Sequence, residues 1–343
     1  MLKRTLLSLL PCAAMLAAVF TENFDNGLNT WGRWNAPANK VSYEFDKNEG
    51  CAAPGCALIR FNDGNDPSKS SVFIRRFAGL EAGTYIFSAK CKAIGGDDVT
   101  ATLAVQSGKN TEKDGKTTWV YQAKLGDTSK KVSVDQWRTI SVVFVLEDGI
   151  VPQLLPGAKG PAGCGCLFDD ITLEKIDFTK GYKDAFDCNA WNIWKANPKD
   201  KISMLYTDDE GHLDKGAVAI EYQESNPAHK SVCLLRRFPV RPGQEYNFLV
   251  FVKAVDLPDN MKVSLSIQAQ DMDNQFLGIP PLRTLTTAGQ CREWKRLVLT
   301  YRIPTTGKWE KCANILVTMG GTSTQKGILY FDDFQFFPSQ DED

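Results

Sequence analysis

The sequence has little of what most enzyme sites and membrane proteins require. It holds only two histidines, His212 and His229, and neither stands in a Ser, Cys or metal motif. The HExxH, P-loop and GxSxG motifs are absent. Beyond the first residues, no stretch is apolar for long enough to cross a bilayer. These absences disfavour metalloprotease, nucleotide-dependent and serine-hydrolase chemistry, and they disfavour a membrane span.

An excess of charge of either sign is also lacking. The chain has 40 basic and 41 acidic residues, which leaves a net charge of −1. No broad electrostatic attraction to nucleic acid or to an anionic membrane is therefore expected. A neutral partner, such as an uncharged polysaccharide, fits this balance.

The N-terminus has the features of a secretory signal peptide, which we place at residues 1–20. Lys3 and Arg4 give a basic start, and an apolar run follows from Leu6 to Ala18. Ala17 and Ala18 offer small residues for cleavage. We therefore expect a secreted or extracytoplasmic protein.

An internal repeat organises the rest of the chain. A shift of 161 residues places Val41–Ala93 on Ile202–Ala254 without a gap, and 15 of the 53 positions are identical, where about three are expected by chance. The matches extend to both ends of each copy: Trp31 and Trp34 with Trp191 and Trp194, Trp137 with Trp294, and Asp169-Asp170 with Asp332-Asp333. We expect domains at 21–176 and 177–338, an acidic tail at 339–343, and an accessible seam near residues 176–179 that limited proteolysis would cut.

Each copy is predicted to be all-β. Short runs rich in β-branched and aromatic residues alternate apolar and polar positions, and turn residues separate them. In the first copy these runs are Ala57–Phe61, Val72–Phe77, Thr84–Ala89, Val99–Gln106, Arg138–Val145 and Leu167–Leu173. No stretch shows a convincing helical period. The fold class expected is two tandem antiparallel jelly-roll β-sandwiches.

Both copies resemble carbohydrate-binding modules of the family 4, 9 and 22 type, which are galactose-binding-like jelly rolls. The resemblance rests on an opening Phe-Asp with a following Trp, a Gly before the second strand, a Tyr-bearing strand after a turn, a Trp at a late strand, and a closing aromatic-Asp-Asp strand. In the first copy these are Phe24-Asp25 with Trp31, Gly55, Tyr85, Trp137 and Phe168-Asp169-Asp170; in the second they are Phe186-Asp187 with Trp191, Gly216, Tyr246, Trp294 and Phe331-Asp332-Asp333. The resemblance implies that a polysaccharide or glycan is the partner.

Exposed aromatic side chains are the first candidates to bind sugar, because sugar rings present apolar C–H faces. The first Trp of each pair, Trp31 or Trp191, matches a family position that we interpret as structural. The second, Trp34 or Trp194, is the predicted platform.

Strand parity gives further candidates. In Val99–Gln106 the apolar residues share one face, so Gln106 lies on the polar face, and Gln268 keeps the same place in the second copy. This predicts a polar concave face suited to hydroxyl groups; a merely solvated face is the alternative. Trp137 and Trp294 have the parity to join it, or else plug the end of the sandwich.

The Arg75-Arg76 and Arg236-Arg237 pairs put one Arg on each face of a strand. We predict that Arg76 and Arg237 contact sugar, with a structural ion pair as the alternative.

A structural calcium ion is also implied, because modules of this family often carry one where the first and last strands meet. The matching groups are Asp25, Glu49, Asp169 and Asp170 in the first copy, and Asp187, Glu210, Asp332 and Asp333 in the second. The spacing itself is not diagnostic.

Four cysteines of the first copy form two short pairs, Cys51 with Cys56 and Cys164 with Cys166. In the resembling fold these two regions lie close together. Two outcomes follow, a Cys₄ zinc site or two disulfides, and export favours disulfides that bridge one pair to the other. Cys91 is left over and is expected to be a buried free thiol.

The sequence therefore predicts a non-catalytic carbohydrate-binding protein. A glycosidase needs only two carboxylates, but copies this small do not match the usual glycosidase scaffolds. A structural or adhesive exoprotein that binds another protein is the alternative function, and the oligomeric state stays open.

Overall fold

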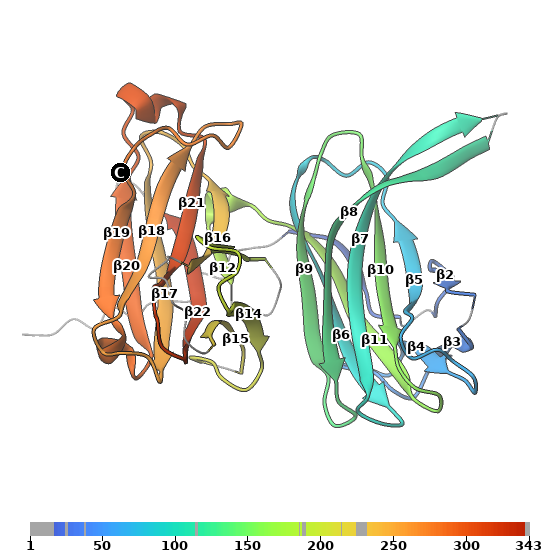
Figure 1. The fold of residues 1–343 in the computed structure, drawn as a ribbon. Coiled ribbons are helices and arrows are strands. Elements are labelled where there is room, and N and C mark those ends of the chain that lie inside the picture. Colours follow the sequence, from blue (N-terminus) through green and yellow to red (C-terminus); the bar gives the residue numbers. More distant parts are fainter. Residues whose placement is uncertain are drawn as a thin grey trace, which may run out of the picture.

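The computed structural model describes residues 17–24, 27–37, 39–113, 116–184, 186, 190–213, 215–223 and 232–339. Each half of the chain forms a sandwich of two antiparallel sheets, and the two sandwiches lie side by side (Figure 1). The described elements are strands, apart from three short 3-10 helices at Phe178–Lys180, Ala288–Cys291 and Gly307–Lys311. The prediction of two tandem antiparallel jelly-roll sandwiches is confirmed.

The first module consists of sheets A and B. Sheet A has the strand order β3-β4-β11-β6-β9, with β1 paired to β11, and sheet B has the order β2-β5-β10-β7-β8. The strands of sheet A are β1 (Ala17–Glu22), β3 (Val41–Asp46), β4 (Cys56–Phe61), β6 (Gly83–Ile94), β9 (Arg138–Leu146) and β11 (Gly165–Lys175). The strands of sheet B are β2 (Gly32–Asn35), β5 (Ser71–Arg76), β7 (Val99–Lys113), β8 (Lys116–Val132) and β10 (Val151–Lys159).

The second module repeats this topology in sheets C and D. Sheet C has the order β14-β15-β22-β17-β20, with β12 paired to β22, and sheet D has the order β13-β16-β21-β18-β19. The strands of sheet C are β12 (Tyr182–Asp184), β14 (Ile202–Thr207), β15 (Ala217–Tyr222), β17 (Glu245–Val255), β20 (Lys295–Arg302) and β22 (Gly327–Pro338). The strands of sheet D are β13 (Asn192–Lys195), β16 (Val232–Pro239), β18 (Lys262–Gln270), β19 (Leu282–Thr287) and β21 (Asn314–Gly321).

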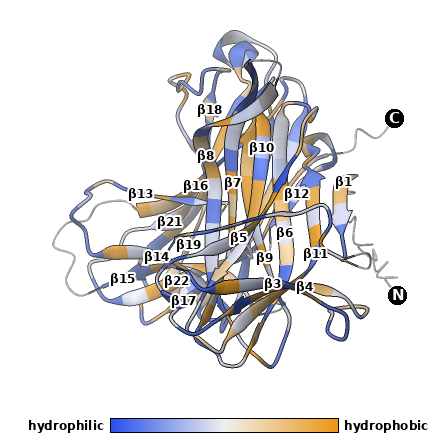
Figure 2. Cartoon of the chain, turned by 90° about the vertical axis from the view of Figure 1, so that its right-hand side faces the viewer, coloured by the Kyte–Doolittle hydropathy of each residue, from blue (hydrophilic) through white to orange (hydrophobic). Residues whose placement is uncertain are grey.

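Alternating hydrophobic and hydrophilic residues give each sheet one core face, and the alternation is visible along the strands in Figure 2. Along β7, Val99, Ala101, Leu103 and Val105 are fully buried. The buried residues form one large cluster in each module, and the two clusters share no member. Two separate cores therefore stabilise two domains.

The six strands named from the first copy are present, but β1, β2, β3, β8 and β10 of this module escaped prediction. β10 contains Pro152 and Pro156, and proline normally argues against a central strand because it cannot donate to the ladder. β8 is rich in Lys and Thr and has too few apolar residues to show a buried face. β10 is held by pairing with β5 and β7, which are distant in the sequence, whereas β8 pairs with β7 as a hairpin.

The first module begins earlier than expected. β1 starts at Ala17 and pairs Ala17 with Lys175 and Ala18 with Glu174. The Phe20 ring packs edge-on against Phe77 at 5.0 Å. Residues 17–20 are thus part of the sandwich sheet, and the rest of the expected signal peptide lies outside the described residues.

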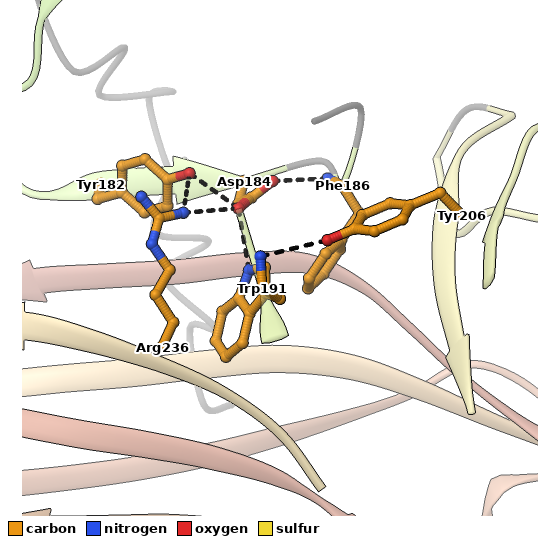
Figure 3. A network of polar contacts seen from close by, with 6 residues as sticks. All are labelled: Tyr182, Asp184, Phe186, Trp191, Tyr206 and Arg236. Carbon is orange, nitrogen blue, oxygen red and sulfur yellow. Dashed lines mark hydrogen bonds and ion pairs between the residues drawn. The ribbon is translucent and has the colours of Figure 1, made fainter. Parts of the chain in front are cut away.

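A buried carboxylate ties the first strand of the second module to the opposite sheet (Figure 3). Asp184 Oδ2 accepts hydrogen bonds from Trp191 Nε1 at 3.0 Å and from Tyr182 Oη at 2.8 Å, and it pairs with Arg236 Nη1 at 3.0 Å. Asp184 Oδ1 accepts the backbone N–H of Phe186, which has a left-handed φ of 57°. Because Asp184 is on β12 and Arg236 on β16, the ion pair joins sheets C and D.

The first module has the same arrangement with a longer acid. Glu22 Oε2 pairs with Arg75 Nη1 at 3.2 Å and accepts a long hydrogen bond from Trp31 Nε1 at 3.4 Å, while Glu22 Oε1 accepts the N–H of Phe24 at 3.1 Å. Trp31 and Trp191 are both buried. The predicted structural role of the two tryptophans is thus supported by a hydrogen bond from each indole N–H to a carboxylate, Glu22 or Asp184, which sequence inspection had not identified.

The seam between the modules packs in part on the second core. Ile176 is buried, and the Phe178 ring packs against Tyr182 and Phe238. Thr179 is exposed. At a separate place, Asp208 of the second module pairs with Arg138 of the first, at 2.7 Å between Oδ2 and Nη1. The cut expected from limited proteolysis near 176–179 stays a prediction.

Removal of the Arg236 guanidinium should destabilise the second module strongly. Arg236→Ala leaves the Asp184 carboxylate buried without its cation, which costs about 3–5 kcal/mol of unfolding free energy. Arg296→Ala is the matched control, because this side chain on β20 is exposed and its loss should change stability by less than about 0.5 kcal/mol. Urea unfolding measures both, and equal losses would contradict the role given to Asp184.

Candidate functional site

The outward face of sheet B carries a groove of about 560 Å³. Its floor is made by the residues of β5, β10 and β7 whose parity turns them away from the core. The predicted site residues Trp34, Arg76 and Gln106 all line it. A concave face is therefore present where strand parity predicted one, and it carries apolar residues such as Val72, Ile74 and Leu155 beside the polar ones.

A first row of side chains crosses the groove from Trp34 to Ser129. Cross-strand pairing aligns Trp34 with Val72, Val72 with Gly157, Gly157 with Thr102, and Thr102 with Ser129. Gly157 is required here, since an added Cβ would lie 2.4 Å from Val72 Cγ1. The row has an aromatic wall at one end and hydroxyl groups at the other.

Trp34 is the exposed aromatic of this groove. Its side chain is 54% exposed although it lies on strand β2. Tyr43 Oη donates to the backbone carbonyl of Trp34 at 2.5 Å and helps to fix the strand. An indole held at this edge can cover the apolar face of a sugar ring.

A second row, which includes Arg76, is a hydrogen-bonded chain of polar groups. Arg76 Nε donates to Gln153 Oε1 at 2.7 Å, and Gln153 Nε2 donates to Gln106 Oε1 at 3.3 Å. The relay leaves the Arg76 terminal nitrogens and the Gln106 amide nitrogen free of these bonds. These are donors of the kind that sugar hydroxyl groups accept. Gln153 was missed because it lies on the unpredicted strand β10.

Trp119 closes one end of this row. Its ring lies over Gly108, where an added Cβ would be 2.2 Å from Trp119 Cε2, and it faces Arg76 at 4.8 Å. Trp119 Nε1 donates to the carbonyl of Val151 at 3.2 Å. Trp119 stands on β8, in the hairpin that projects beyond the sheet in Figure 1.

The outward face of sheet D has the same register. Trp194 pairs with Cys233, Cys233 with Gly320, and Gly320 with Ser264, as in the first row of sheet B. Trp194 is 49% exposed. The predicted Trp194 platform thus has the same register and a similar exposure to Trp34, on an outward face rather than in a groove.

Arg237 and Gln268 also share this outward face, and both are level with Leu316. Arg237 Nε donates to Gln270 Oε1 at 2.9 Å, so Gln270 and not Gln268 holds the guanidinium. Leu316 replaces Gln153 at the centre, and the polar relay of the first module is not repeated.

Trp137 and Trp294 do not join either groove, which corrects the prediction. Trp137 packs beside Leu58 and Leu167 on the outer face of sheet A. Trp294 lies 6.0 Å from the His212 ring, beside sheet C. Parity gave the correct outward face, but the strands that these residues precede, β9 and β20, belong to the other sheet of each sandwich.

The carboxylates named for calcium are engaged with protein groups. Glu49 pairs with Lys92 at 3.4 Å and Glu210 with Lys253 at 3.1 Å. Other carboxylates of the set form hydrogen bonds: Asp169 Oδ2 with the Cys51 N–H at 2.7 Å, Asp332 Oδ2 with the His212 N–H at 2.6 Å, and Asp333 Oδ2 with His212 Nδ1 at 2.8 Å.

Asp170 and Asp333 both have a left-handed backbone, with φ of 44° and 48°. Within the described residues, no three His, Cys, Asp or Glu side chains form a group that could hold a metal ion. Asp25 and Asp187 lie outside the described residues. Calcium stays a prediction.

The four paired cysteines are free thiols, so the predicted bridges are absent. Cys56 lies on the outer face of sheet A, whereas Cys166 points into the core, on the opposite face of the same sheet. The backbone carbonyl of Cys164 accepts a hydrogen bond from the N–H of Phe61. Phe61 is at the far end of β4, about 17 Å along the strand from Cys56. The adjacency implied by the resemblance therefore does not bring the sulfurs together, for two disulfides or for zinc.

Fold and groove together define a class: a tandem jelly-roll β-sandwich protein with an outward groove on one sheet of the first module and the same register in the second. No family model matches the chain, and no curated protein matches its sequence. No helix of the described part is long and apolar enough to span a membrane.

Solved structures with similar folds include the tandem CBM22-1–CBM22-2 domain of Paenibacillus barcinonensis Xyn10C, at 11% identity over 95% of this chain and 98% of that one, with a TM-score of 0.35. A xylan-binding CBM22 domain covers 46% of this chain and 95% of its own length, at 11% identity and a TM-score of 0.32. TmCBM61, solved with β-1,4-galactotriose, covers 44% and 90% at 15% identity and a TM-score of 0.32.

The free thiols make a testable prediction. Burial and nearby carboxylates raise the pKa of Cys56 to about 12, so at pH 8 it is a protonated thiol and a poor nucleophile. We expect iodoacetamide to label half-buried Cys51 in the native protein and to leave Cys56 and Cys91 unlabelled. In guanidinium without reductant all three should react, as read by peptide mass spectrometry. Cysteine peptides that react only after reduction would show that the disulfides exist and would contradict the free thiols.

Proposed function

We propose that this chain is a secreted, non-catalytic polysaccharide-binding protein, in which the outward faces of sheets B and D each bind a glycan chain. The observation that carries the proposal is the sheet B groove, with exposed Trp34 at its edge and the Arg76–Gln153–Gln106 relay on its floor. This combination of one aromatic wall and several fixed donors is what sugar recognition requires.

The arrangement divides the work of recognition. Trp34 covers the C–H face of a ring, while Arg76 and Gln106 donate to hydroxyl groups. The donors are held before a ligand arrives, because Gln153 is nearly buried and bonds to both neighbours. Less side-chain entropy is then lost on binding.

The groove chemistry supports binding rather than hydrolysis. A glycosidase places two carboxyl groups about the scissile bond. Asp127 is the one carboxylate among the described residues that line the groove, and it pairs with Lys124 at 2.9 Å between Oδ1 and Nζ. The five strands of sheet D contain no Asp or Glu.

Trp34→Ala and Trp194→Ala should each weaken glycan retention, and the double variant should abolish it. The reason is loss of the stacking surface, and the expected decrease is about tenfold per site for a loss of 1–2 kcal/mol. Affinity electrophoresis in xylan, β-1,4-galactan and other neutral polysaccharides measures the retention. Xylan and the galactan are chosen because solved structures of similar fold are named for these ligands.

Trp137→Ala is the control, since this Trp lies on the other sheet. It should leave retention unchanged. The melting temperature of the Trp34 and Trp194 variants should stay near that of the parent, because both side chains are about half exposed. Retention equal to the parent in the double variant, or capture of proteins and no polysaccharide, would refute the proposal.

A further inference from the structure

The outward faces of sheets B and D share their register but differ in charge. In sheet B, Asp127 on β8 lies opposite Ala104 on β7. In sheet D the same place, opposite Ser266 on β18, is occupied by Arg283 on β19. One acidic position in the first module is thus a basic position in the second.

The sheet B face carries an acid as well as bases. Asp127 pairs with Lys124 at 2.9 Å, and Lys131 at the same edge pairs with Asp98 at 3.6 Å. Arg76 forms no ion pair with a carboxylate in the described part of the chain, and Arg237 has its place in sheet D. The two faces therefore share this arginine, and Asp127 is the charge that distinguishes the first from the second.

The charged residues on the sheet D face have no ion-pair partners of this kind. Arg237, Lys262 and Arg283 are all exposed, and in the described part of the chain none of them forms an ion pair with a carboxylate. All three share the outward parity of Gln268 or its cross-strand neighbours. Since the strands of sheet D contain no acid, this face is uniformly basic.

The acid that follows β18 does not neutralise this face. Asp271 Oδ1 accepts the backbone N–H groups of Asp273 at 3.0 Å and Gln275 at 2.8 Å, so it is used within its own turn. Beside it, the buried Gln270 gives Oε1 to Arg237, and its Nε2 has no acceptor in the described structure. Donors exceed acceptors at this end of the face.

We propose that the second module binds an acidic saccharide, a glycan with uronate carboxylates, while the first binds a neutral stretch. The proposal rests on the proposed function, because it assigns a substrate class to the sheet D face. Trp194 stacks on a ring, and Arg237 and Arg283 donate hydrogen bonds to carboxylates, for which the planar guanidinium is suited. The two arginines are offset by two residues along the strands, about 7 Å, so they address different sugar units.

The test uses the full chain with Trp34→Ala, so that retention reports on the second groove. Polygalacturonate is the acidic probe and unsubstituted xylan the neutral one, in affinity electrophoresis. We expect stronger retention on polygalacturonate, a decrease with added salt, and a loss of tenfold or more with Arg283→Asp. Arg283→Gln should lose less, because it removes the cation without adding an anion.

Arg296→Asp is the matched control, an exposed arginine on β20 of sheet C with the same change of charge. It should leave retention on polygalacturonate unchanged. Equal losses in the two variants, or no retention on polygalacturonate, would overturn the proposal. Equally tight, Arg283-dependent binding of single-stranded DNA would also overturn it, as a general polyanion site.

The same experiment distinguishes failure of the proposed function from failure of the acidic assignment. The chain with Trp34 intact should bind neutral polysaccharide whatever the second groove prefers. If it does and polygalacturonate is not bound, the acidic assignment fails alone. If no polysaccharide of either kind is bound, both fail.

Discussion

An ion pair between the first strand and the opposite sheet organises each module; it is buried in the second module and partly buried in the first. Asp184 and Arg236 join sheets C and D, as Glu22 and Arg75 join sheets A and B. Breaking such a pair is costly, because the remaining charge stays buried. Side chains alternate along a strand, so fixing Arg236 toward the core turns Arg237 toward the groove. The same contact that stabilises the sandwich therefore sets the register of the binding face.

That coupling explains how one scaffold can hold two different sites. The rows that cross sheets B and D keep an exposed Trp, a glycine in the middle strand and an outward Arg. Changes at other positions of the same rows alter the chemistry without touching the core: Gln153 becomes Leu316 and Asp127 becomes Arg283. Specificity in this fold depends on the outward half of the strand alternation, while stability depends on the inward half.

Sequence inspection predicted a large part of this because the relevant signals are local. The repeat predicted two modules, and the alternation in Val99–Gln106 placed Gln106 on the outward face. The position of Trp34 three residues after a structural Trp was enough to name it as the platform. By contrast, Gln153 was missed, since Pro152 and Pro156 hid the strand that carries it.

The sequence by itself thus determined the class of fold, the number of modules and the face on which each strand residue lies, because a two-residue period is a property of the chain segment alone. Only the tertiary structure decided which sheet each strand joins. That choice put Trp137 and Trp294 beside the wrong sheets for a groove, placed Cys56 and Cys166 on opposite faces of sheet A, and brought Gln153 between Arg76 and Gln106. Pairing between strands far apart in sequence depends on the packing of the whole core, and no local pattern encodes it.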